Sequence, residues 1–216
     1  GAVLGGAIVD GGKFDWMAHA DKFPGLCTPD DSYHGITYAE RFGKEGAFIT
    51  KATAQLMRDF GSMQSPMNAY MLNLGLESLH VRMQRHCANG MAVAEFLESH
   101  PKVEKVYYPG LESSPSKALA DKQFEGNGYG GMLCVNFKGG QKEIDKLISN
   151  LQLVRFVPTL AGVGTTLTYP PRASHRDLSP DELAAIGITM GQIRLSSGLE
   201  DTDDLLNDFD QALAKM

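Results

Sequence analysis

The chain is poor in cysteine and lacks long apolar runs, and each shortage excludes a class of protein. Its three cysteines, Cys27, Cys87 and Cys134, are too few and too scattered for a disulfide framework, which favours a reducing cytoplasm. No apolar run is long enough to span a bilayer, so we expect no membrane segment. The six histidines form no paired-ligand pattern, so the sequence predicts no structural metal site.

Basic side chains are also in the minority: the chain has 20 basic and 26 acidic residues, which gives a net charge of -6. No basic tail or stripe is present that could neutralise phosphates, so we expect no nucleic-acid partner. Hydrophobic residues make up 43% of the 216 positions. That share suits a soluble globular protein of one large or two small domains.

The first ten residues (GAVLGGAIVD) predict a buried strand that begins at the first position. Neither an initiator methionine nor a basic region precedes the apolar run, so a signal peptide is not expected. A buried strand of this kind needs neighbours on both sides. We therefore expect this polypeptide to be the later part of a longer one.

Residues 22–46 are rich in Gly, Pro, Asp and aromatics, which predicts a long loop. Such a loop, with Tyr33 and His34 in it, is either a packed Ω-loop or a functional, possible active-site loop. Helical patterns follow over 49–60 and 65–100. The second has one apolar face made of Leu72, Leu76, Leu79, Met83, Cys87, Met91 and Ala94.

From residue 101 onward strands and helices alternate, which predicts a small α+β domain of four or five short strands and three or four helices. Its clearest local signal is 179–182 (SPDE), a capping box with proline in the first helical turn, and Gly187 ends that helix. The glycine-rich run 126–131 lacks a following helix and a Lys-Ser/Thr pair. It is therefore interpreted as a turn into a strand rather than a phosphate-binding loop.

Arg194 stands in a short apolar strand between Ile193 and Leu195. A cation in such a strand is costly unless it meets an anion. Two partners are compatible with the pattern: a carboxylate of the protein itself, or a substrate carboxylate held bidentately by the planar guanidinium.

Several runs carry a resemblance that covers essentially the whole chain. They are 193–201 (IRLSSGLED), 174–175 (SH) with 178–182 (LSPDE), 65–69 (SPMNA) with 75–79 (GLESL), and 107–111 (YYPGL). The chain resembles the later half of the pyridoxal-phosphate (PLP) enzymes of cysteine and methionine metabolism. Residues 23–35, 42–43 (FG) and 56–61 (LMRDFG) are most similar to the O-acetylhomoserine sulfhydrylases of that family.

The resemblance implies an α/β fold with an α+β C-terminal domain, the later half of an aspartate-aminotransferase-like (type I) PLP fold. Residues 1–60 would then be a remnant of the large PLP-binding domain with an active-site or interface loop. Residues 61–100 would be a long linking helix, and 101–216 the small C-terminal domain. Family members are cytoplasmic dimers of dimers, so a homo-oligomer is expected.

The resemblance also implies a γ-replacement reaction that makes homocysteine or methionine from O-acetyl-L-homoserine and sulfide or a thiol. Methionine γ-lyase or cystathionine lyase activity is the alternative within the family. A noncatalytic interaction fragment is the alternative of another class. Arg194 falls where the family binds the substrate α-carboxylate, and Thr159 and Leu160 match the segment that completes this pocket through a side chain and a backbone N–H.

Three departures from the family pattern bear on the site. Ser or Asn is more usual at the position of Thr159, and 169–172 (YPPR) replaces a more usual His-Pro-Ala-Ser/Thr run. Arg172 is either a second cation near the pocket or a solvated side chain. The largest departure is that the Schiff-base lysine is expected upstream of Gly1. Lys13, Lys22, Lys44 and Lys51 do not lie in its motif, so no catalytic residue is assigned to this chain, and PLP would be bound mostly by the missing N-terminal half.

Overall fold

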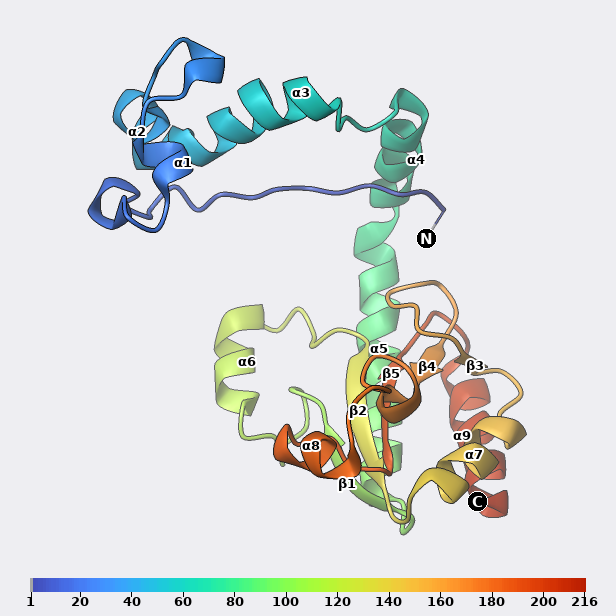
Figure 1. The fold of residues 1–216 in the computed structure, drawn as a ribbon. Helices are drawn as coiled ribbons and strands as arrows, with labels where there is room; N and C mark the ends of the chain where they lie inside the picture. The colour runs from blue at the N-terminus through green and yellow to red at the C-terminus, as the bar shows by residue number, and fades with distance from the viewer. Residues whose placement is uncertain (1) are drawn as a thin grey trace. The chain divides into compact units, whose positions relative to one another are not determined.

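The computed structural model describes residues 2–216, and the chain divides into two compact units, Gly1–Leu76 and Glu77–Met216. Each unit has a hydrophobic core of its own. Their elements are labelled in Figure 1. The predicted assignment of segments 1–60, 61–100 and 101–216 to parts of a larger enzyme stays a prediction.

The first unit is helical. Its small core consists of Leu26, Tyr38, Ala39 and Ala47, with Trp16 packed against them. The elements in chain order are η1 (Met17–His19), α1 (Pro24–Cys27), η2 (Asp31–Tyr33), α2 (Tyr38–Lys51), the π-helical segment η3 (Ala52–Met57), α3 (Arg58–Phe60) and α4 (Pro66–Glu77).

Two predictions for the first unit are wrong. Residues 2–10 form neither strand nor helix, and Leu4 and Val9 are 88% and 90% exposed. The described part of this unit contains no strand, so the apolar run has no neighbour to pair with. The loop predicted over 22–46 also ends early, because α2 begins at Tyr38. Gly43, with φ of 62°, interrupts the helical geometry inside α2, so only part of the segment from Tyr38 is regular helix.

The second unit is built around a five-stranded sheet with the order β1-β2-β5-β4-β3. All pairings are antiparallel except that of β3 with β4. Its elements are α5 (Leu79–Ser99), β1 (Val103–Tyr107), α6 (Lys117–Phe124), β2 (Met132–Phe137), α7 (Gln141–Asn150), β3 (Arg155–Phe156), β4 (Thr166–Thr168), η4 (Pro170–Arg172), α8 (Pro180–Ala185), β5 (Gln192–Ser196) and α9 (Thr202–Lys215).

The core of the second unit lies between one face of the sheet and the helices α5, α7 and α9 (Figure 1). Alternate residues of the central strands, such as Leu133, Ile193 and Leu195, point into this core. The helices contribute residues such as Leu97 and Phe209. Because successive strand residues face opposite sides, Arg194 lies on the other face of the sheet.

The helix predicted over 65–100 is two helices, since α4 ends at Glu77 and α5 begins at Leu79. Only the later part of the predicted apolar face is buried; Leu76 remains 61% exposed, whereas Ala94 is fully buried. The predicted capping box at α8 is confirmed, because the Ser179 N–H donates to Glu182 and the Glu182 N–H donates back to the Ser179 hydroxyl.

Two kinds of feature are missing from residues 2–216. None of their helices combines the length and the apolar character needed to cross a bilayer. Likewise, their His, Cys, Asp and Glu side chains form no group of three or more that could hold a metal ion.

Candidate functional site

The sheet face opposite the core is polar, and Arg194 lies near its centre. On β5, Arg194 stands directly opposite Cys134 of β2 and Thr168 of β4. Two residues further along the same face, Ser196 stands opposite Thr166. Cross-strand partners share a face with side chains about 5 Å apart. Four polar side chains, three on neighbouring strands and Ser196 on β5 itself, therefore share this face with Arg194.

Arg194 is half-buried and has no partner for its charge. Its Nε is buried without a hydrogen bond, and no carboxylate among residues 2–216 lies within ion-pair distance of it. The first alternative, pairing with the protein's own carboxylate, is therefore wrong for the described chain. Burial raises the pKa of the Cys134 thiol and the charge of Arg194 opposes that rise, so the neighbouring thiol is no anionic partner either. An unsatisfied buried donor of this kind fits an external anion.

The loop between β3 and β4 carries Thr159 and Leu160 and is tied to this same face. The Ser196 hydroxyl accepts the N–H of Ala161 at 3.0 Å. The Thr166 hydroxyl donates to the carbonyl of Thr159 at 2.8 Å. The residue between these two anchors, Leu160, is 49% exposed, and within residues 2–216 its N–H has no hydrogen-bond partner. The structure thus brings the turn with both predicted pocket residues to the side of the sheet that bears Arg194.

A second set of contacts joins the same loop to the turn after β5. Leu199 N–H donates to the Val163 carbonyl at 2.8 Å, and Gly198 N–H donates to the Thr165 hydroxyl at 2.8 Å. The Glu200 carboxylate accepts both the N–H and the hydroxyl of Thr165. A Cβ at Gly198 would lie 2.5 Å from the Val163 carbonyl oxygen, so this close approach requires glycine.

Polar side chains of helix α5 form hydrogen bonds to backbone carbonyls of the turn at 197–200, and the sequence analysis did not identify these side chains. His86 Nδ1 lies 2.7 Å from the Ser197 carbonyl, and Asn89 Nδ2 donates to the carbonyls of Gly198 and Glu200 at 3.0 and 2.9 Å. Arg85 also donates to the Glu200 carbonyl. Buried polar residues require partners, and these partners are carbonyls far away along the chain. A signal was present, because His86 and Asn89 interrupt an otherwise apolar helical face.

The start of β3 is held by a buried carboxylate on α9. Asp208 is 6% exposed and accepts the N–H groups of Gln152, Leu153 and Val154 at 2.8 to 2.9 Å. A carboxylate that accepts several backbone N–H groups makes strong, charge-assisted bonds. Asp208 thus fixes the segment before the loop that carries Thr159, and the Glu200 contacts with Thr165 fix the segment after it.

Tyr33 and His34, the predicted loop residues, lie in the first unit. Tyr33 is half-buried and stacks on Tyr38 with ring centroids 5.7 Å apart. His34 is exposed to solvent, and its backbone has the left-handed conformation. Asp30 anchors this loop: its carboxylate pairs with Lys51 at 2.7 Å and accepts the Ser32 hydroxyl. The Lys51 hydrogen bond, then that of Ser32, lowers the pKa of Asp30 to about 2. The loop is packed, and a role in an active site remains a prediction.

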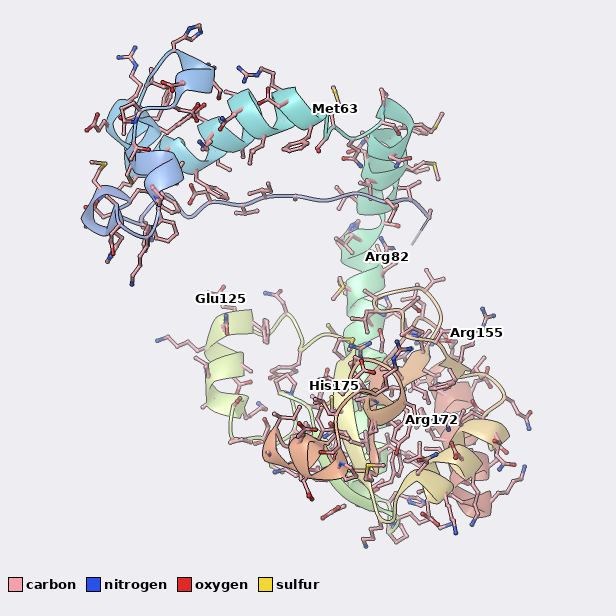
Figure 2. All side chains as sticks on the ribbon, in the orientation of Figure 1. Met63, Arg82, Glu125, Arg155, Arg172 and His175 are labelled. Atoms are coloured by element: carbon pink, nitrogen blue, oxygen red, sulfur yellow. The ribbon has the colours of Figure 1, made fainter. Side chains whose placement is uncertain are left out.

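Arg172 is not a free second cation, and its side chain is exposed to solvent, as the second alternative states. It pairs with Asp145 of α7, and both side chains are about half exposed. His175 lies three residues further (Figure 2). Its Nδ1 is 2.8 Å from the Ser174 hydroxyl. The ion pair neutralises the charge that Arg172 could have offered to an anion on the sheet face.

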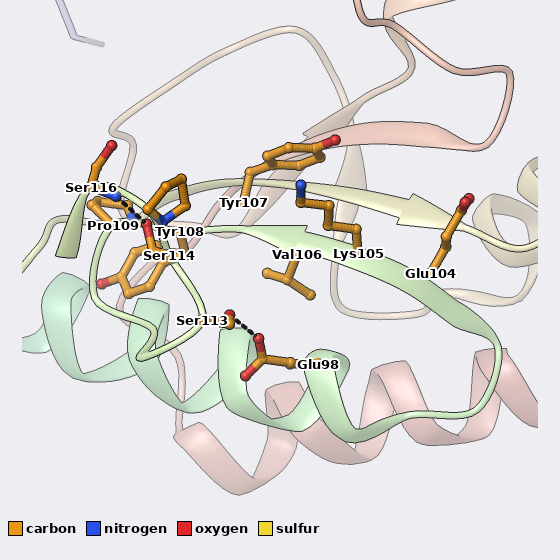
Figure 3. Close-up of a pocket in the computed structure, with 11 residues that line it drawn as sticks. Glu98, Glu104, Lys105, Val106, Tyr107, Tyr108, Pro109, Ser113, Ser114 and Ser116 are labelled. Carbon is orange, nitrogen blue, oxygen red and sulfur yellow. Dashed lines mark hydrogen bonds between the residues drawn. The ribbon is translucent and has the colours of Figure 1, made fainter.

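A pocket of about 470 Å³ lies at the outer edge of β1 (Figure 3). Strand β1 forms one wall and the segment 113–116 lies opposite, where the Ser113 hydroxyl donates to Glu98. Glu98, Glu104 and Lys105 are the charged residues of its lining. Because none of the residues on the polar face around Arg194 lines it, this pocket is separate from the candidate site.

Comparisons with known proteins agree with this architecture. The sequence model of the Cys/Met metabolism PLP-dependent enzyme family matches residues 1–214. An O-acetyl-L-homoserine sulfhydrylase from Leptospira meyeri is 40% identical, and the match covers 99% of this chain and 49% of that protein. A homocysteine synthase from Schizosaccharomyces pombe is 39% identical, with the same two shares covered.

A solved structure from Campylobacter jejuni, described as an O-acetylhomoserine (thiol)-lyase, superposes with a TM-score of 0.79 at 34% identity. It covers 90% of this chain and 45% of that one, and it contains N′-pyridoxyl-lysine-5′-monophosphate. The predicted fold class, the later part of an aspartate-aminotransferase-like (type I) fold, is confirmed by this likeness. The chain spans about half the length of the curated relatives it matches. It belongs to the Cys/Met metabolism family of PLP-dependent enzymes.

Proposed function

We propose that this chain is part of an enzyme that makes homocysteine from O-acetyl-L-homoserine and sulfide, or methionine when a thiol replaces sulfide, by γ-replacement. The relatives named O-acetyl-L-homoserine sulfhydrylase and homocysteine synthase support this reaction. The observation that carries the proposal is Arg194, a half-buried guanidinium on a polar sheet face with a buried Nε that has no partner.

In the proposed enzyme, Arg194 binds the α-carboxylate of the amino-acid substrate through parallel N–H donors. Thr159 and the N–H of Leu160 complete this pocket. Bound PLP would supply the electron sink that makes the bonds at the substrate α- and β-carbons labile. The contribution of this chain is orientation: a carboxylate fixed at one end limits how the substrate can rotate, and correct placement accounts for a large part of many rate enhancements.

The described residues fit the substrate side of such a site and not the cofactor side. The unpartnered donor is a guanidinium suited to a carboxylate. By contrast, Lys51, one of the four lysines nearest the start of the chain, is already paired with Asp30. We therefore assign no bond to PLP to any residue of this chain. For the whole protein, we propose that the lysine that holds PLP and the rest of the cofactor site lie outside this chain. We also propose that the whole protein is a homotetramer located in the cytoplasm.

The reaction is tested by assaying the full-length enzyme with O-acetyl-L-homoserine plus sulfide and, separately, with methionine alone. We expect homocysteine in the first assay and no 2-oxobutanoate in the second. Ammonia and 2-oxobutanoate formed from methionine would instead indicate a γ-lyase. Arg194→Gln should raise KM for O-acetyl-L-homoserine at least tenfold, since a charged hydrogen bond contributes roughly 1.5–3 kcal/mol.

The gene itself tests the alternative of a noncatalytic interaction fragment. We expect the reading frame to continue upstream of the codon for Gly1 through a Ser/Thr-x-Thr-Lys run. A reading frame that encodes only the 216 residues would contradict the proposed enzyme, because the chain has no assigned cofactor lysine.

A further inference from the structure

Two neighbouring hydroxyls on the polar face of the sheet hold the backbone that lies beside Arg194. Ser196 of β5 and Thr166 of β4 are direct cross-strand partners. Both side chains belong to buried residues, 3% and 8% exposed. Neither hydroxyl bonds to the other; each reaches instead to the 159–161 turn.

The two bonds fix opposite ends of that turn. Ser196 accepts from the N–H of Ala161, and Thr166 donates to the carbonyl of Thr159. Ala161 has a φ of 56°, a conformation that costs a non-glycine residue roughly 1–2 kcal/mol, so the turn needs outside support. Leu160 lies between the two anchors, its N–H has no hydrogen-bond partner among residues 2–216, and both Thr159 and Leu160 are exposed residues.

Ser196, Thr166 and Arg194 all lie on two paired strands, β4 and β5. Ser196 is two residues from Arg194 on β5, which places both side chains on the same face roughly 7 Å apart along the strand. Thr166 has the same relation to Thr168, which stands opposite Arg194 on β4. The distance between the turn and the guanidinium is therefore determined by the register of two paired strands.

We propose that Ser196 and Thr166 are positioning residues, whose hydroxyls hold the 159–161 turn so that Leu160 N–H and Thr159 face the carboxylate bound by Arg194. The inference rests on the proposed function. According to this inference, the two hydroxyls are needed for the enzyme to bind substrates with an α-carboxylate more tightly than the corresponding amines. Without the pair, the turn relaxes away from the carboxylate while Arg194 stays in place.

The experiment uses the full-length enzyme loaded with PLP and two probes that differ only in the carboxylate: L-methionine and 3-(methylthio)propylamine. Dissociation constants are measured from the change in the visible absorption of the cofactor. We expect Thr166→Val, which has nearly the same shape without the hydroxyl, to weaken L-methionine binding about tenfold, the equivalent of one lost hydrogen bond. Binding of the amine should be unchanged. Thr166→Ser, which keeps the hydroxyl, should stay within about twofold of the wild type.

Ser196→Ala should reproduce the selective loss, and it answers the same question if Thr166→Val fails to fold. Ser99→Ala, which removes an exposed hydroxyl at the end of α5, is the matched control and should bind both probes normally. Equal losses for both probes in Thr166→Val and Ser196→Ala would overturn the inference, because they would indicate a purely structural role. So would normal L-methionine binding in both variants.

Arg194→Gln separates the inference from the proposed function. If it loses the preference for L-methionine over the amine whereas both hydroxyl variants keep it, only the positioning role is wrong. If Arg194→Gln keeps the preference, the carboxylate site itself is wrong and the inference falls with it.

Discussion

At the scale of single residues, Arg194 is expected to oppose stability in the chain without substrate. Its Nε is buried and unpaired, and an unsatisfied buried donor costs about 1–3 kcal/mol. We therefore predict that Arg194→Met raises the free energy of unfolding by about 1 kcal/mol, because methionine fills similar space without a charge. The measurement is urea denaturation followed by far-UV circular dichroism.

Arg155→Met is the matched control for this substitution. Arg155 is exposed on the edge strand β3 (Figure 2), so the same change there should alter stability by less than about 0.5 kcal/mol. If Arg194→Met instead destabilised the chain by more than 1 kcal/mol, Arg194 would have a protein partner in solution and its assignment to an external carboxylate would be wrong.

Single residues also mark the limit of sequence reasoning at the site. The cost of a cation in an apolar strand identified Arg194, and the family resemblance identified Thr159 and Leu160. Ser196 and Thr166 could not be found in this way. Their role depends on the register of β4 against β5, which brings residues thirty positions apart into one row. Serine and threonine occur on many strands, so neither stands out in the sequence.

At the scale of elements, side-chain signals predicted the start of α8 correctly, whereas apolar character alone did not predict which segments pair as strands. The capping box at Ser179 is confirmed, because it depends on side chains that bond within three residues. The strand predicted over residues 1–10 is wrong within the described part, because a strand requires a neighbour that apolar character alone does not supply. Short-range hydrogen bonds can be predicted from sequence, and pairing partners cannot.

The turn that Asp30 caps, at the start of η2, provides a prediction on pH at the same scale. The folded pKa of Asp30 is about 2, below its ordinary value of 3.8. A lowered folded pKa means that the ionised carboxylate stabilises the fold above about pH 4, and that this contribution is lost as the pH falls through 2. We predict that Asp30→Asn lowers the urea midpoint of Trp16 fluorescence at pH 7, and that this difference from the wild type shrinks between pH 4 and 2.

Asp31→Asn is the control for the Asp30 prediction. Asp31 is an exposed neighbour on the same turn, and its carboxylate makes no ion pair within the described chain. Its removal should leave the wild-type pH profile intact. Parallel profiles for wild type and Asp30→Asn from pH 7 to 2 would mean that the ion pair with Lys51 does not hold this loop.

At the scale of the whole molecule, the two units differ greatly in how much apolar surface they bury. The first unit has a core of four buried residues, and large side chains such as Leu4, Phe60 and Met63 are more than 70% exposed. The second unit buries residues from α5, α7, α9 and all its long strands in one cluster. Since burial of apolar area is the main source of stability, the first unit should be the weaker one.

We predict that the 216-residue chain unfolds in urea in two steps, with the first unit unfolding at a midpoint lower by about 1 M or more. The single tryptophan, Trp16, packs against the core of the first unit and reports on it alone. Far-UV circular dichroism reports on both units. The fluorescence transition should therefore precede the main loss of ellipticity, and Phe209→Ala, a core change in the second unit, should shift only the later step. Coincident transitions by the two probes would show that the cores unfold as one cooperative structure.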